Sequence, residues 1–261
     1  MTRALKNLVK QTMKQFGIGV TGYDRLEQLE ARNRRADDLD LILELPVRHA
    51  AELMKTLRNS RSQYRQDLFV LSELDFKVNG FFVEFGATNG VDLSNTYLLE
   101  KDFGWNGILA EPARRWHADL LSNRTCSIEK ACVWRESRLK LKFNETDQGE
   151  ISTIYSFNSS DHYVGNRKRG VTYSVETISL EAMLDKYKAP KWIDYLSIDT
   201  EGSEYDILSV FDFDKYAFRV ITVEHNFTQN REKIFGLLTR HGYVRKLESM
   251  SKCDDWYVKV E

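Results

Sequence analysis

The chain has 261 residues, a formal net charge of -1 and three cysteines. The nearly neutral charge gives no reason to expect a nucleic acid as partner. The cysteines Cys126, Cys132 and Cys253 lack C-x-x-C spacing and indicate neither a disulfide framework nor a zinc site. No apolar run of about 18 residues predicts a membrane span, and no signal peptide is recognisable. Together these features favour a cytoplasmic protein.

Residues 1–61 are rich in Leu, Arg, Asp and Glu and predict an N-terminal helical extension. Leu5, Val9, Met13 and Phe16 share one face of a basic amphipathic helix. Such a helix would attach to the inner face of a membrane or to a partner, or it would pack on the core or on a second copy in a homo-oligomer. Acidic residues that follow soon after favour packing.

Phe81 to Phe85 form an apolar run with the length and aromatic content of a buried strand. Gly86 and Gly90 punctuate its end, and a glycine lets the backbone turn sharply and approach a ligand closely. A second strand, Gly107 to Ala110, ends in Glu111-Pro112, where an acid is expected to reach a ribose diol. Two strand ends, each with its acid, predict one cofactor cleft.

The glycine spacing is not that of a dinucleotide site. Gly86 to Gly90 reads G-x-x-x-G and lacks the middle glycine that lets backbone touch a pyrophosphate. Glu84 would repel a pyrophosphate but suits an ammonium group. A ligand with a positive amino-acid end and an adenosine ribose is S-adenosylmethionine, which we favour over a nicotinamide or flavin. An ordinary strand-to-helix turn would explain the glycines but not both acids.

From residue 79 onwards strands and helices alternate, which predicts an α/β doubly wound sheet. An antiparallel hairpin, Tyr243 to Leu247 with Trp256 to Val260, would close it in a seven-stranded, mostly parallel pattern. A polar, turn-rich interval is expected from Asn144 to Gly170. The other expected elements are strands at Ser127 to Trp134, near Thr177, at Ile193 to Ile198 and at Arg219 to Val223, and helices at Leu180 to Tyr187, from Glu204, and through Leu238.

A second group of acids follows the later strands. Asp199 and Glu201 come after one strand, and Glu224 and His225 after the next, so all should face the same cleft. Asp199, Glu224 and His225 would form a ligand set for Mg2+ or Mn2+. His225 could instead be a general base or orient one. The two roles exclude each other, because a metal-bound nitrogen cannot also take a proton. Alternatively, Glu201 or Glu204 only stabilises the positive end of the following helix, and His225 is a hydrogen-bonded structural histidine.

Several segments together resemble the FkbM family of S-adenosylmethionine-dependent methyltransferases. They are SQYRQDLF from Ser62, FVEFGATNGVDLSNT from Phe82, ILAEP from Ile108, SLEAML from Ser179, IDYLSIDTEGSEYDIL from Ile193 and TVEHN from Thr222. The resemblance spans residues 62–261 and leaves residues 1–61 outside. It implies a class I, Rossmann-like domain and methyl transfer to oxygen, commonly on sugars of surface polysaccharides or on polyketide hydroxyls.

The resemblance also implies roles for single residues. Asp199 would border the methyl group, and Ala131 and Cys132 would flank the adenine. Glu111, followed by Pro112, would hold the ribose. The amino-acid end of the cofactor would be surrounded by Glu84, Gly86, Ala87, Asn89 and Gly90, followed by Ser94, Asn95 and Thr96.

The interval Ile151 to Thr177 is the expected acceptor-binding segment. Its aromatic side chains could stack on sugar faces, and Arg167, Lys168 and Arg169 could meet a phosphate or acidic sugar unless they lie in a solvated loop. The expected activity is O-methylation of a sugar-containing acceptor. A nucleotide-sugar oxidoreductase would share the cleft but should bind NAD, and a non-catalytic binding module would keep the fold without cofactor affinity.

Overall fold

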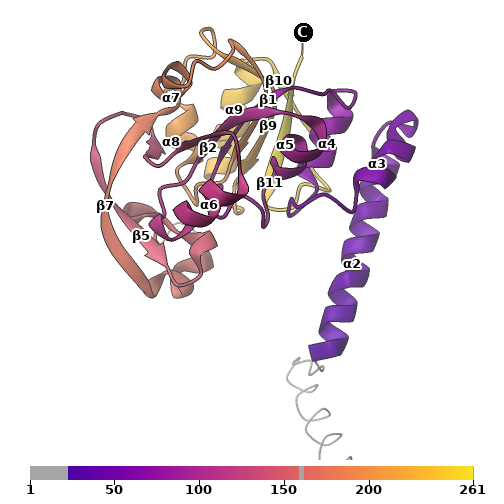
Figure 1. The fold of residues 1–261 in the computed structure, drawn as a ribbon, viewed down its shortest axis with the longest axis horizontal. Helices are drawn as coiled ribbons and strands as arrows, with labels where there is room; N and C mark the ends of the chain where they lie inside the picture. Colours follow the sequence, from indigo (N-terminus) through magenta and orange to yellow (C-terminus); the bar gives the residue numbers. More distant parts are fainter. Residues whose placement is uncertain (1–22, 159–161, 261) are drawn as a thin grey trace, which may run out of the picture.

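The computed structural model describes residues 23–158 and 162–260. The amphipathic helix expected around Leu5 to Phe16 lies outside them. Within the described residues, no helix has the length and apolar character that a membrane crossing requires. The chain folds around a seven-stranded sheet, with a long helix, α2 (Tyr23–Glu44), projecting on one side and a smaller sheet on the other (Figure 1).

The large sheet has the order β10-β11-β9-β8-β1-β2-β3. Its five central and edge strands β9, β8, β1, β2 and β3 are parallel, while β11 runs antiparallel to both β9 and β10. The predicted mostly parallel sheet with a C-terminal hairpin is therefore confirmed. Its strands are β1 (Phe81–Phe85), β2 (Asn106–Ala110), β3 (Ser127–Glu129), β8 (Trp192–Ile198), β9 (Ala217–Glu224), β10 (Tyr243–Lys246) and β11 (Asp254–Lys259).

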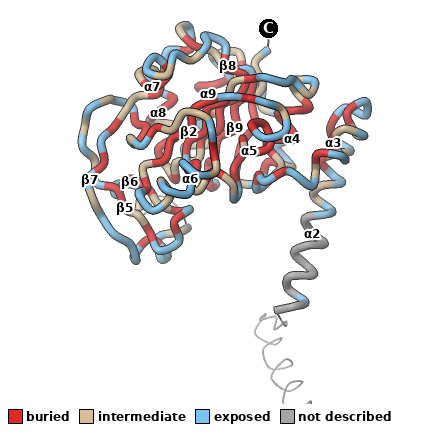
Figure 2. Tube along the Cα trace, in the orientation of Figure 1, coloured by how far each residue is buried: buried red, intermediate tan, exposed pale blue. Residues whose placement is uncertain are grey.

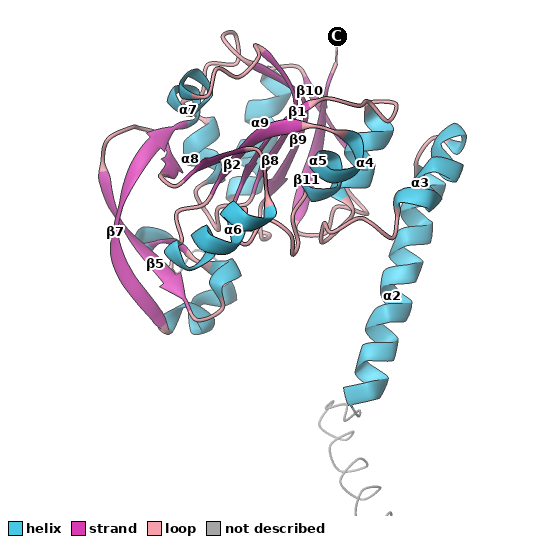
Figure 3. Cartoon of the chain, in the orientation of Figure 1, coloured by secondary structure: helices cyan, strands magenta, loops and turns pink. Residues whose placement is uncertain are grey.

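Helices cover both faces of this sheet, because neighbouring strand residues point to opposite sides. Val83 and Phe85 pack with one set of helices, and Phe82 packs with the other. The first set is α7 (Leu180–Lys186), α8 (Glu204–Leu208) and α9 (Asn230–Arg240); the second is α4 (Gln66–Glu73), α5 (Tyr97–Phe103) and α6 (His117–Asn123). Figure 2 shows the strands buried between these layers, and Figure 3 shows the helices around them.

The helices ahead of the sheet share its core. Leu41 in the last turn of α2, Leu45 directly after it, and Leu53 of α3 (Ala50–Thr56) are buried in the same cluster as α4. A short 3-10 helix, η1 (Val47–His49), joins α2 to α3. The predicted helical character of this region is confirmed over the described residues, and its C-terminal half packs on the core.

The prediction of one strand from Ser127 to Trp134 is wrong. β3 ends at Glu129, and β4 (Cys132–Trp134) pairs with β7 in the second sheet. The Glu129 carboxylate accepts the backbone N–H of Ala131 at 2.9 Å. Such a local side-chain bond competes with strand pairing and turns the chain between the two sheets.

The interval from Asn144 to Gly170, predicted as polar turns, also contains parts of a second sheet. β5 (Lys140–Thr146) and β7 (Gly170–Ser179) form a long antiparallel pair, and β6 (Thr153–Ile154) extends it, so the strand expected near Thr177 is ten residues long. Many of its side chains are exposed, which gives a weak apolar signal. Short 3-10 helices lie between these strands and after β2: η2 (Arg114–Trp116), η3 (Gly149–Ile151), η4 (Tyr155–Phe157) and η5 (His162–Lys168).

Candidate active site

A pocket lies at the carboxyl ends of β1, β2 and β8. Its wall opposite the sheet comes from the insertion between β4 and β7, including Phe143, Gly149 and Ile154. The space open to water inside it is about 80 Å³, below the roughly 300 Å³ of typical ligand sites. Of the sequence-predicted residues, those that line the pocket are Glu84, Gly86, Asn95, Glu111, Pro112, Cys132, Asp199 and Glu201.

The turn after β1 depends on Gly86. Its φ is +72°, a conformation that favours glycine, and its backbone N–H donates to the carbonyl of Ala110 at 3.1 Å. A Cβ at this position would collide with the carbonyl oxygen of Asp199. The missing side chain thus lets the ends of β1, β2 and β8 close on one another around the pocket.

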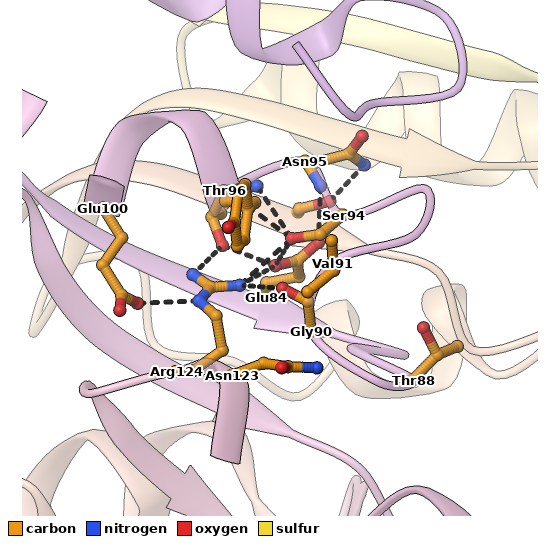
Figure 4. A network of polar contacts seen from close by, with 12 residues as sticks. Glu84, Thr88, Gly90, Val91, Ser94, Asn95, Thr96, Glu100, Asn123 and Arg124 are labelled. Carbon is orange, nitrogen blue, oxygen red and sulfur yellow. Dashed lines mark hydrogen bonds and ion pairs between the residues drawn. The ribbon is translucent and has the colours of Figure 1, made fainter. Parts of the chain in front are cut away.

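The carboxylate of Glu84 accepts hydrogen bonds from the loop that follows β1. Its buried carboxylate accepts hydrogen bonds from the hydroxyls of Ser94 and Thr96 and from the backbone N–H of Asn95, at 2.5 to 3.0 Å (Figure 4). These bonds fix the loop that leads into α5. The Glu84 carboxylate therefore organises the wall of the pocket.

The centre of this network is Arg124, which the sequence reasoning missed. Its fully buried guanidinium donates to Glu100 at 2.7 Å, to the carbonyl of Gly90 at 3.0 Å and to the hydroxyl of Thr96 at 2.9 Å. It also lies 3.8 Å from Glu84. Figure 4 shows these groups converging on one cation. Burial pushes the pKa of Glu100 upward, but the charge and hydrogen bonds of Arg124 bring it down to about 2.

Glu111 stands at the end of β2 with a buried carboxylate. One oxygen accepts the backbone N–H of Thr88 at 2.8 Å, and the other accepts that of Ala113 at 2.7 Å. A carboxylate oxygen can accept more than one hydrogen bond, so both retain capacity toward the pocket. Burial raises the pKa of Glu111 to about 7, although the two N–H groups oppose this shift.

Three carboxyl groups meet at the ends of β8 and β9. Asp199, Glu201 and Glu224 each offer an oxygen, and these oxygens lie within 4.8 Å of one another. Burial raises the pKa of both Asp199 and Glu224, and the repulsion between them raises that of Glu224 further. A hydrogen bond joins the two carboxyl groups. This pair can hold a proton at neutral pH beside the pocket.

Arg167 ties the insertion to this cluster. Its guanidinium is fully buried and donates to Glu201 at 2.6 Å and to the carbonyl of Ile151 at 3.0 Å. The hydroxyl of Thr153 donates to the carbonyl of Glu201 at 3.0 Å. Arg167 is therefore a buried structural cation, whereas Lys168 and Arg169 are exposed.

His225 lies away from the pocket. Its Nδ1 accepts the backbone N–H of Phe227 at 3.0 Å, and its Nε2 is buried 3.7 Å from Asp255. The described cluster of metal-type ligands contains Glu201 in the place that the sequence analysis gave to His225. Burial lowers the pKa of His225, which favours its neutral form.

Asp254 and Gln66 complete the end of the pocket nearest Asp199. Gln66 donates to the Asp254 carboxylate at 2.7 Å. Burial raises the pKa of Asp254 to about 7, and the nearby charge of Asp199 contributes to the rise. Neither residue was singled out as a site residue, because they lie 188 residues apart in the chain and only the tertiary fold brings them together.

Four other predicted residues, Ala87, Asn89, Gly90 and Ala131, do not line the pocket. Ala87 is buried under the turn, and Asn89 organises that turn through hydrogen bonds to Val91 and Asp92. Gly90 accepts from Arg124. Cys132 lines the pocket where the adenine was expected, beside Val133, whereas Ala131 does not.

Comparison with known proteins identifies a family for this chain. A family model described as the methyltransferase FkbM domain matches residues 84–254. No curated protein matches the chain. Precorrin-6y C5,15-methyltransferase from Geobacter metallireducens is similar at 12% identity over 74% of this chain and 85% of that one, with a TM-score of 0.40. A chain of the fibrillarin/Nop5p complex is similar at 10% identity over 76% and 84%, with a TM-score of 0.35.

Proposed function

Because the chain belongs to the FkbM methyltransferase family, we propose that it transfers a methyl group from S-adenosylmethionine to a hydroxyl oxygen of a sugar-containing acceptor. Membership of this family implies that the methyl donor is S-adenosylmethionine. The transfer to oxygen and the sugar are the further steps that we propose. We assign the reaction to residues 62–261 and treat residues 1–61 as an extension.

The observation that carries the proposal is the position of Glu111. Its carboxylate is buried at the end of β2, held by one backbone N–H on each oxygen, and lines the pocket. A pair of adjacent ribose hydroxyls suits an acid held in this way. Cys132 and Val133 supply an apolar wall for an adenine.

The residues at the far end fit proton removal from an alcohol. Bound S-adenosylmethionine supplies an electrophilic methyl group, so the protein needs mainly to orient a hydroxyl and to accept its proton. Asp199 lines the pocket and shares a hydrogen bond with Glu224. We propose that this carboxyl pair accepts the hydroxyl proton. His225 is not carried into this role, because it faces Asp255.

A divalent cation at Asp199, Glu201 and Glu224 is a second proposal for the same atoms. Three close carboxylate oxygens are a ligand set that Mg2+ or Mn2+ accepts. The ion pair between Glu201 and Arg167 already neutralises one of these acids, which weakens the case for a metal. Methyl transfer that persists after exhaustive EDTA treatment would support the proton-sharing pair instead.

Calorimetric titration tests the cofactor directly. We expect S-adenosylmethionine to bind the wild-type protein and NAD not to bind. Glu111→Ala should abolish binding, while Glu136→Ala, at an exposed acid on the loop after β4, should leave it unchanged. Binding of NAD instead of the methyl donor would overturn the proposal in favour of an oxidoreductase. Binding of S-adenosylmethionine that survives Glu111→Ala would contradict the assigned ribose site.

A further inference from the structure

A second hollow lies between the N-terminal helices and the large sheet. Its volume is about 520 Å³, within the roughly 300–1,000 Å³ typical of ligand sites. The end of α2 forms one wall, and the loop ahead of β11 forms another. The remaining walls are the segment ahead of α4 and the loop after β1. In chain order, the four walls come from residues 37–41, 60–65, 92–93 and 250–252.

This hollow adjoins the cofactor pocket. Gln63, Asp92 and Leu93 line both spaces. At this shared edge Tyr64 follows Gln63, and its hydroxyl lies 3.5 Å from the Cys253 thiol, which directly precedes Asp254 of the cofactor pocket. A methyl acceptor must reach the reactive end of the cofactor from a site of its own. The second hollow has the position that this requirement sets.

The lining carries no excess of charge. Asp38 pairs with Arg65 at 2.7 Å, and Asp37 pairs with Lys252 at 3.2 Å. Arg61 and Asp92 add one further charge of each sign. Hydroxyls, a carboxamide and a half-buried tyrosine ring fill the spaces between them. Such a surface offers donors and acceptors to an uncharged, hydroxyl-rich ligand and does not select for an anion.

We propose that this hollow binds the acceptor as an uncharged sugar unit, so that the N-terminal extension forms part of the substrate site. The inference rests on the proposed methyltransferase function. It relocates the acceptor from the segment Ile151 to Thr177. There, the ring of Phe157 packs on Trp134, and the Tyr173 hydroxyl donates to Glu145. The described aromatic residues Tyr155, Phe157, Tyr163 and Tyr173 line neither space.

Saturation-transfer NMR tests the site without knowledge of the natural acceptor. The probes are methyl glycosides of common hexoses and deoxyhexoses, added to protein saturated with S-adenosylhomocysteine. Arg61→Trp and Met250→Trp fill the hollow from two walls. Arg58→Trp is the matched control, because Arg58 is an exposed arginine close in sequence that does not line the hollow.

We expect at least one glycoside to bind wild type and Arg58→Trp, and its signal to disappear in both filling variants while S-adenosylhomocysteine affinity is unchanged. Persistence of the glycoside signal in both filling variants would overturn the location. If no glycoside bound to the loaded wild-type protein, the sugar assignment would fall. A wild-type protein that did not bind S-adenosylhomocysteine would contradict the proposed function itself, which separates the two failures.

Discussion

Replacing Arg124 by Met should strongly destabilise the fold. The substitution keeps most of the apolar stem but removes a fully buried cation that contacts Glu100 at 2.7 Å and lies 3.8 Å from Glu84. Glu84 would lose the cation beside it, and Glu100 would keep only the partly exposed Lys101 at 3.1 Å. Removing one partner of a buried ion pair costs about 3–5 kcal/mol. At roughly 2–4 °C per kcal/mol, the melting temperature should fall by about 6–20 °C.

Thermal unfolding followed by circular dichroism measures this effect, with Arg48→Met as control. Arg48 pairs with Asp75 at a largely exposed site, so its removal should change the melting temperature little. The double variant Arg124→Met, Glu100→Gln removes one orphaned acid and should recover part of the loss. If the melting temperatures of wild type, Arg124→Met, Glu100→Gln and the double variant showed no coupling between positions 124 and 100, the proposed electrostatic cause would be refuted.

The ion pair between Arg124 and Glu100 also makes the stability of the fold depend on pH. The folded pKa of Glu100 is about 2, below its ordinary 4.5, so the folded protein binds fewer protons than the unfolded chain between these values. The stability that Glu100 contributes is therefore present above about pH 4.5 and is lost as the pH falls toward 2. In Arg124→Met this acid-dependent loss should shrink. If Arg124→Met lost as much stability as wild type between pH 4.5 and pH 2, the ion pair between Arg124 and Glu100 would not be the cause.

Three further predictions concern the pocket. The pKa of Glu111 is raised to about 7, so S-adenosylmethionine affinity should increase as the pH rises through that value and the carboxylate forms; in Glu111→Gln, calorimetry should find weak affinity without this dependence. Asp199→Asn should lower turnover of an acceptor found by screening by about 10²–10⁴-fold while the dissociation constant of the methyl donor changes little; equal turnover would remove Asp199 as proton acceptor. Arg167→Met should remove the buried ion pair with Glu201 and speed proteolysis of residues 149–158, whereas Arg169→Met, at an exposed position, should not.

The sequence determined the large sheet and its order of elements because its strands are apolar on both faces. Phe81 to Phe85 and Ile193 to Ile198 are mainly apolar and are buried along almost their whole length, as strands between two helical layers are. The acids Glu84, Glu111 and Asp199 were found for the same reason, since each stands directly at or after such a strand. Strand-end acids in a parallel sheet must lie at one edge.

Only the tertiary structure decided how those acids are used. Arg124 belongs to no recognisable motif, and its pairing with Glu84 spans separate elements, so the structural role of Glu84 was not readable from the chain. The same holds for Arg167. It belongs to the basic tripeptide Arg167 to Arg169, a pattern that is typical of a solvated loop, and only the structure shows that its side chain is buried. His225 directly follows Glu224, and the local course of the chain after β9 turns its ring toward Asp255.

Local sequence patterns record which side of a strand or helix is apolar, and that information was sufficient for the doubly wound fold. They do not record which distant groups share a buried space, because long-range contacts depend on how completed elements pack. The second hollow is the clearest case, since residues 37–41, 60–65, 92–93 and 250–252 line it together. The sequence determined the methyltransferase framework, and the packing of the extension against it decided where a second ligand could lie.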